Sequence, residues 1–154
     1  MTITLLGDST PTLSIAGDRD VAEAGLPARG SEPAGSDATS TSEIATGALA
    51  VTTGNDSIAS LIINGINVTN GGSVTGASGT LAVTRSGSTY SYTYTLTDNT
   101  SGNATSDSFG VVVTDSDGDS ATDTLVIAII DDVPITANDA DSIAAGQYGP
   151  ATGN

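Results

Sequence analysis

The sequence contains no cysteine, lysine, histidine or tryptophan, and aromatic residues make up only 3% of the chain. Without cysteine no disulfide can stabilise the fold, and without lysine no Lys–Asn isopeptide crosslink can form. The usual nucleophile activators and proton shuttles of enzymes are missing too, so only carboxylate pairs remain for catalysis. These carboxylates fall in predicted turns and linkers without an aromatic-lined cleft, and we therefore expect no enzymatic activity.

Positive charge is also scarce, because 18 acidic residues face 3 basic ones and the formal net charge is −15. Nucleic acid is an improbable partner, since Arg19, Arg29 and Arg85 are scattered along the chain and cannot form a phosphate-binding patch. The longest strongly apolar stretch, residues 125–130, is far below the ~20 residues needed to span a bilayer, so we expect no membrane insertion. Such acidity destabilises a compact state unless a cation neutralises the carboxylates.

Period-2 alternation of apolar and polar residues predicts an all-β chain. In residues 89–97, Tyr90, Tyr92 and Tyr94 point to one side, where a buried core face is favoured over a sugar-stacking platform. Further strands are predicted at residues 46–52, 58–63, 66–68, 79–85, 109–114 and 122–130. This pattern indicates an immunoglobulin-like or cadherin-like β-sandwich with Greek-key connections and about seven to nine strands.

A short stretch near the start of the chain recurs near its end. Residues 5–11, followed by Asp18, Asp20 and Gly25, match residues 129–134, followed by Asp139, Asp141 and Gly146. We interpret the match as a tandem array. Residues 1–17 are then the end of a preceding repeat and its linker, residues 18–134 a complete sandwich, and residues 135–154 a linker and the start of the next repeat.

Acidic residues are predicted to gather at the two poles of this sandwich. The turn DSDGD at residues 115–119 places carboxylates at alternate positions around a glycine, as a cation with six to eight oxygen ligands requires. Because the final strand ends at the C-terminal pole, the turn before it lies at the N-terminal pole, beside the incoming linker. The candidate Ca²⁺ ligands at the N-terminal pole are Asp8, Asp18, Asp20, Glu23, Asp115, Asp117 and Asp119. Those at the C-terminal pole are Asp98, Asp107, Asp131, Asp132, Asp139 and Asp141.

The alternative for these residues is an Asx-rich turn and an acidic hinge that are merely solvated. For five other acidic residues the solvated interpretation is preferred: Glu32, Asp37, Glu43, Asp56 and Asp123.

Several segments of the chain resemble the bacterial Ig-like repeats of giant RTX adhesins secreted by the type I pathway. They are VAEAGLP at residues 21–27, YSYTYTLTDNT at 90–100, DSFGVVVTDSDGDSATDTL at 107–125 and DDVP at 131–134. The resemblance implies an extracellular, Ca²⁺-rigidified extender that holds a distal ligand-binding region away from the cell for surface attachment and biofilm formation. The two joints differ, since Ala144 stands where the first joint has Glu23.

Two functions therefore remain open. In the first, the chain is a monomeric spacer whose partners are the adjacent repeats of the same polypeptide, joined through Ca²⁺. In the second, the domain itself, or its Ser-, Gly- and Pro-rich excursion at residues 28–42, binds a glycan or a peptide.

Overall fold

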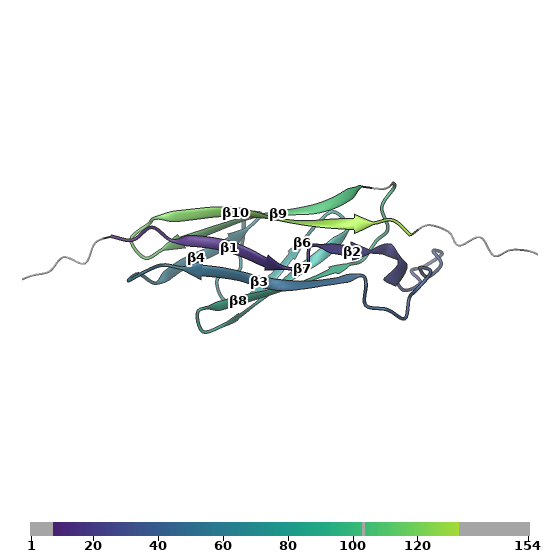
Figure 1. The fold of residues 1–154 in the computed structure, drawn as a ribbon, viewed down its shortest axis with the longest axis horizontal. Coiled ribbons are helices and arrows are strands. Elements are labelled where there is room, and N and C mark those ends of the chain that lie inside the picture. Colours follow the sequence, from purple (N-terminus) through teal and green to yellow (C-terminus); the bar gives the residue numbers. More distant parts are fainter. Residues whose placement is uncertain (1–7, 103, 133–154) are drawn as a thin grey trace, which may run out of the picture.

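A computed structural model describes residues 8–102 and 104–132 of the chain. They form an elongated β-sandwich, shown in Figure 1, with one short 3-10 helix, η1, at Glu23–Gly25. The strands are β1 Thr12–Gly17, β2 Asp20–Ala22, β3 Ile44–Thr52, β4 Ile58–Ile63, β5 Ile66–Asn67, β6 Gly72–Thr75, β7 Gly79–Ser86, β8 Thr89–Leu96, β9 Thr105–Asp115 and β10 Ser120–Ile130. None of the helices in the described ranges has the length and apolarity to cross a membrane.

The strands are arranged in two five-stranded sheets, ordered β1-β3-β8-β7-β6 and β2-β10-β9-β4-β5. Neighbours in the sheets are antiparallel except β2 and β10, which run parallel. Connections between β3 and β4 and between β8 and β9 cross from one sheet to the other, which is the Greek-key pattern of an immunoglobulin-like sandwich. The expected fold class is thus confirmed, with ten strands in residues 8–102 and 104–132 where seven to nine were predicted.

The core lies between the sheets and is built from the alternate residues of each strand. Tyr90, Tyr92 and Tyr94 of β8 are at most 2% exposed, so the tyrosine ladder is a core face as predicted. Phe109 of β9 meets Tyr94 in a T-shaped contact with 5.9 Å between the ring centroids. Burial of each large apolar side chain contributes about 1.5–3 kcal/mol, and these rings add to a core built mainly from aliphatic residues.

The first strand changes sheets halfway along the sandwich. Over Thr12–Gly17, β1 pairs with β3, and after a break at Gly17 the chain continues as β2 in the opposite sheet, against the end of β10. Gly17 has φ +121°, and a Cβ atom there would lie 2.4 Å from the Cα of Gly47. Glycine is therefore needed both for the backbone conformation and for the close approach of two chains.

This pairing corrects the expected boundary of the sandwich. Residues 12–17 had been assigned to the end of a preceding repeat, but they form β1 and pair with β3 of the same sandwich. The sequence TLSIAG offers only Leu13 and Ile15 as inward residues, and its alternation is too short to stand out. The predicted change of repeat at residues 135–154 lies outside the described residues.

The two poles of the sandwich are defined by where the chain arrives and leaves. As Figure 1 shows, β1 begins at one end and β10 finishes at the other. The N-terminal pole comprises the residues before β1, the β3–β4 turn and the β9–β10 turn. The C-terminal pole comprises η1, the loop at residues 26–43, the segment after β8 and residues 131–132. Traction on the chain therefore acts along the length of the sandwich.

Substitution of Gly17 by alanine tests the change of sheets at the first strand. We expect Gly17→Ala to lower the free energy of unfolding by about 3 kcal/mol, because it adds a left-handed alanine and a backbone clash. The matched control is Gly30→Ala, which shares a positive φ but meets no atom within 4 Å and should cost only about 1 kcal/mol. Urea unfolding of both variants measures the difference, and equal losses would contradict the close packing of β1 on β3.

Candidate metal-binding site

Three segments that are distant in the sequence bring carboxylates together at the N-terminal pole. Asp8 precedes β1, Asp56 lies in the β3–β4 turn, and the remaining acids belong to the β9–β10 turn. Asp8, Asp117 and Asp119 form one group whose oxygens lie within 4.8 Å of one another, and Asp56, Asp115 and Asp117 form a second. These five carboxylates are called the N-terminal acidic cluster below.

The β9–β10 turn fixes the orientation of the central carboxylate of this cluster. Asp115 closes a hairpin in which its backbone N–H donates to the carbonyl of Asp119 at 3.0 Å, and Gly118 adopts φ +108°. The Oδ1 atom of Asp115 accepts hydrogen bonds from the N–H groups of Gly118 at 3.2 Å and Asp119 at 2.8 Å. The other oxygen, Oδ2, is buried and has no hydrogen-bond partner. Asp115 as a whole is only 1% exposed.

A buried carboxylate oxygen without a partner is unfavourable, because it has lost its water and gained nothing in return. Burial raises the pKa of the Asp115 carboxyl, and the neighbouring Asp117 carboxyl raises it further. Within the described residues the ion pairs all involve Arg29, which lies at the opposite pole. No basic side chain in this part of the chain offsets the cluster, and its donor atoms are all carboxylate oxygens. That is the ligand type preferred by hard divalent cations.

Two hydroxyl groups attach the residues before β1 to the same turns. The Oγ atom of Ser9 donates to Asp56 Oδ2 at 3.0 Å and to the Thr53 carbonyl at 2.9 Å. The Oγ1 atom of Thr10 lies 3.4 Å from Asp119 Oδ2. The segment that carries Asp8 is therefore held against both turns even by neutral groups.

The structure brings together part of the set predicted for this pole. Asp8, Asp115, Asp117 and Asp119 meet as expected. Asp56, which was expected to be solvated, is half-buried and belongs to the second group. The signal for it was available, because the turn GND at residues 54–56 precedes a strand that begins at the same pole.

Asp18, Asp20 and Glu23 do not lie at the N-terminal pole, which corrects their assignment. Because β1 and β2 together run most of the length of the sandwich, the residues after β1 are carried toward the opposite end. Asp18 and Asp20 line a shallow depression with Ile44 and Ile130, and both are exposed.

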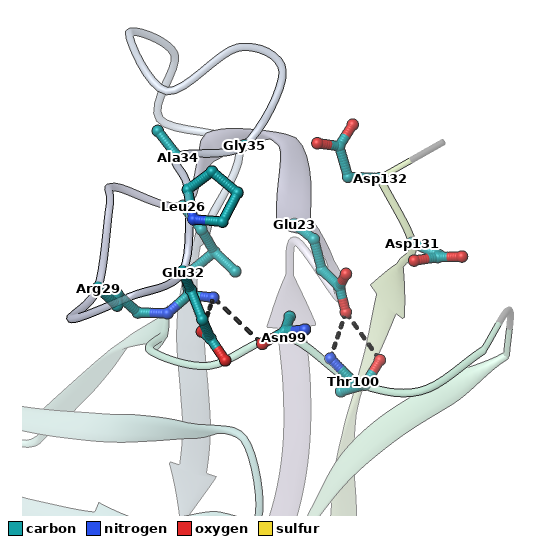
Figure 2. A pocket seen from close by; sticks show the side chains of 11 residues that line it. Glu23, Leu26, Arg29, Glu32, Ala34, Gly35, Asn99, Thr100, Asp131 and Asp132 are labelled. Atoms are coloured by element: carbon teal, nitrogen blue, oxygen red, sulfur yellow. Dashed lines mark hydrogen bonds and ion pairs between the residues drawn. The ribbon is translucent and has the colours of Figure 1, made fainter. Parts of the chain in front are cut away.

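Glu23 lies at the C-terminal pole, in the polar pocket shown in Figure 2. It is only 5% exposed, and its Oε1 atom accepts hydrogen bonds from the backbone N–H of Thr100 at 2.6 Å and the Thr100 hydroxyl at 2.8 Å. Asp131 and Asp132 line one side of this pocket at the end of β10, and Asp132 accepts hydrogen bonds from the N–H and the hydroxyl of Ser36. Glu23 thereby ties η1 to the segment after β8.

Arg29 lies on the other side of the same pocket in Figure 2. Its guanidinium forms an ion pair with Glu32 at 2.9 Å and donates to Asn99 Oδ1 at 3.2 Å. Its Nε atom is 4.0 Å from Asp98, which is exposed. Asp98, Asp131 and Asp132 therefore share this pole, as predicted, although their carboxylate oxygens do not form a compact group like those of the N-terminal acidic cluster. Asp139 and Asp141 lie outside the described residues.

Asp107 was predicted to be a ligand at the C-terminal pole, and this prediction is wrong. Its side chain is 2% exposed and points into the sandwich. The carboxylate accepts hydrogen bonds from the N–H groups of Ala77, Ser78 and Gly79 and from the Tyr94 hydroxyl, at 2.8–3.2 Å. Both oxygens are therefore occupied. The role of Asp107 is to fix the β6–β7 turn to the core.

Replacement of Asp107 by asparagine distinguishes this structural role from metal binding. The new amide NH₂ group would face backbone N–H donors, so we expect Asp107→Asn to destabilise the domain by about 1–3 kcal/mol. The loss should be the same with Ca²⁺ and with a chelator, and Tyr94→Phe, which removes one donor, should cost about 1 kcal/mol. Urea unfolding under both conditions is the measurement. A loss seen only with Ca²⁺ would return Asp107 to the ligand set.

The two poles thus differ in the chemistry that they offer. At the C-terminal pole Glu23 and Asp132 accept hydrogen bonds from Thr100 and Ser36, and Asp98 approaches Arg29. The buried Oε2 atom of Glu43 also has no hydrogen-bond partner, but among the described residues Glu43 does not belong to a group of carboxylates like the N-terminal acidic cluster. The N-terminal acidic cluster has grouped carboxylates, one of which, Asp115, has a buried oxygen without a partner, an arrangement able to hold a metal ion. No family model, curated protein or solved structure matches this chain.

Proposed function

We propose that this chain is a Ca²⁺-stabilised extender repeat of a large secreted bacterial adhesin, which projects a distal ligand-binding region for surface attachment and biofilm formation. The observation that carries the proposal is the buried, unpartnered Oδ2 of Asp115 within the N-terminal acidic cluster. Its burial costs free energy unless a cation sits beside it. The segmental resemblance of the sequence to RTX adhesin repeats adds the cellular context.

Calcium suits this cluster better than the smaller magnesium ion. Ca²⁺ accepts six to eight oxygen ligands in flexible geometry, whereas Mg²⁺ demands a near-ideal octahedron and retains several waters. Here the oxygens come from two turns and a chain segment, and Asp8 and Asp117 are exposed, so water can complete an irregular coordination shell. Extracellular calcium modules bind at about 10⁻⁴–10⁻³ M, which matches the calcium concentration of a secreted environment.

A cation in this position would act mechanically. It would join the segment before β1 to the β3–β4 and β9–β10 turns, and so fix the direction in which the incoming chain meets the sandwich. Because β1 begins and β10 ends at opposite poles, successive repeats held in this way would form a rod with the adjacent repeats as its partners (Figure 1). The joint on the C-terminal side includes residues outside the described ranges.

The burial of the tyrosines favours the spacer over a glycan-binding module. Stacking of a sugar requires an exposed aromatic face, and Tyr90, Tyr92 and Tyr94 all point into the core. The loop at residues 26–43 is largely exposed, but its one arginine is engaged by Glu32 and Asn99. A spacer of this kind would bind neighbours of its own polypeptide and would need no catalytic groups.

Thermal unfolding with and without calcium tests the proposed function. At free Ca²⁺ a hundred times the dissociation constant, one site adds about 2.7 kcal/mol, which corresponds to an increase in Tm of roughly 10 °C for a domain of this size. We expect a chelator to remove the increase and Asp117→Asn to lose most of it. Asp123→Asn is the matched control, because Asp123 is exposed on β10 outside the cluster. A Tm that is indifferent to Ca²⁺ would refute the proposal.

Hydrogen exchange at the start of the described chain tests the mechanical role. If a cation joins Asp8 to the β9–β10 turn, backbone amides of residues 8–10 should exchange more slowly in Ca²⁺ than in a chelator. We expect the same slowing at residues 116–119 and none at residues 86–89 of the β7–β8 turn. In Asp117→Asn the protection should disappear at both segments. Protection of the turn without any change at residues 8–10 would separate calcium binding from stiffening of the joint.

A further inference from the structure

The N-terminal acidic cluster consists of two overlapping groups of oxygens. Asp56, Asp115 and Asp117 form the first, and Asp8, Asp117 and Asp119 the second, so Asp117 belongs to both. Resting on the calcium site proposed above, we infer that this pole holds two Ca²⁺ ions that share the Asp117 carboxylate. The inner ion lies among Asp56, Asp115 and Asp117, and the outer ion among Asp8, Asp117 and Asp119.

The carboxylates of the inner position come from the β3–β4 turn and the β9–β10 hairpin. Asp115 is 1% exposed and presents its unpartnered Oδ2, while Asp56 is half-buried and held by the Ser9 hydroxyl at 3.0 Å. Asp115 Oδ1 is already engaged by two N–H groups, so the direction of Oδ2 is fixed before any ion arrives. A preorganised, largely desolvated ligand strengthens binding because little is lost in ordering it.

The outer position depends on the chain that precedes β1. Asp8 is exposed, Asp119 is partly exposed, and they reach the shared Asp117 from different segments. Within the described ranges, the hydrogen bond that joins the Asp119 side chain to the incoming segment is the long 3.4 Å contact with Thr10. We therefore expect weaker Ca²⁺ binding here than at the inner position, because part of the binding free energy is used to hold Asp8 against the turn.

The charge balance favours more than one divalent ion. Five carboxylates carry a charge of about −5 when ionised, so a single Ca²⁺ leaves about −3 and two leave about −1. A carboxylate has two oxygens and can serve two ions at once, and water supplies the rest of the six to eight ligands of each. With one ion, two or more carboxylates would remain close together without a counterion, at a cost in repulsion or protonation.

The two ions would then have different tasks. The inner ion holds the β3–β4 turn to the β9–β10 turn and stabilises the sandwich itself. The outer ion holds the incoming chain and sets the stiffness of the joint. Calcium levels between the two dissociation constants would give a folded repeat with a loose joint.

Counting bound ions in matched variants tests the shared site. Native mass spectrometry and calorimetric titration with CaCl₂ on the full chain give the number of ions bound. We expect Asp56→Asn and Asp8→Asn each to lose one ion relative to the unaltered chain, and the double variant and Asp117→Asn to lose two. Asp123→Asn should lose none. Far-UV circular dichroism checks that each variant is folded. Because each variant is compared with the unaltered chain, Ca²⁺ ions bound elsewhere do not affect the difference in the number of bound ions.

The alternatives give different counts. If Asp56→Asn, Asp8→Asn and their double variant each lose the same single ion, the pole holds one cation and the inference is overturned while the calcium-stabilised extender stands. If none of the variants loses an ion, the proposed calcium site is itself wrong. A Tm in saturating Ca²⁺ that falls for Asp56→Asn but not for Asp8→Asn supports the division between an inner and an outer ion.

Discussion

One buried carboxylate oxygen, Oδ2 of Asp115, sets the requirement on which this account depends. It lies among four other acidic side chains, has no hydrogen-bond donor and is shielded from water. Self-repulsion of this kind opposes folding, and the chain offers few ways to offset it, since it has no lysine or histidine and, among the described residues, the ion pairs all involve Arg29 at the opposite pole. A divalent cation converts the same arrangement into an attraction. The proposed cation would stabilise the N-terminal pole, add to the hydroxyl contacts that position the incoming chain, and stiffen the joint.

Much of the sandwich could be predicted from the sequence, because the alternation of apolar and polar residues is easy to recognise in long strands. The tyrosine ladder of β8 and the hairpin partners β7, β9 and β10 lie within a few residues of their predicted bounds. The strands that were missed are short: β1, β2 and β6 offer few inward residues each, and β1 and β2 are parts of one strand split by Gly17. The apolar sequence of β10 does not distinguish its inward from its outward residues, since Val126 and Ile130 are 42% and 52% exposed. Composition alone does not reveal such outward residues.

The candidate site was predictable only where it is local in sequence. The spacing of the aspartates in the DSDGD turn indicated a candidate metal site. The position of this turn beside Asp8 followed from the expected strand topology. Asp18, Asp20 and Glu23 were misplaced because a strand in two halves carries them along the sandwich, which depends on the backbone conformation of a single glycine. Asp107 resembles a ligand in sequence, yet the β6–β7 turn supplies three N–H donors that complete its coordination. Whether a carboxylate is available to a metal ion depends on which hydrogen-bond donors contact it, and those donors come from segments that are distant in the sequence.

The central claim is that a divalent cation completes the coordination of Asp115 Oδ2. A crystal structure of the full chain grown with CaCl₂ at millimolar concentration, with anomalous scattering data, tests it most directly. The account predicts an anomalous peak about 2.3–2.6 Å from this atom, with Asp56 and Asp117 oxygens in the same shell. Density that instead shows only water beside Asp115, with the carboxylates of Asp56 and Asp117 turned away from it, would contradict the account.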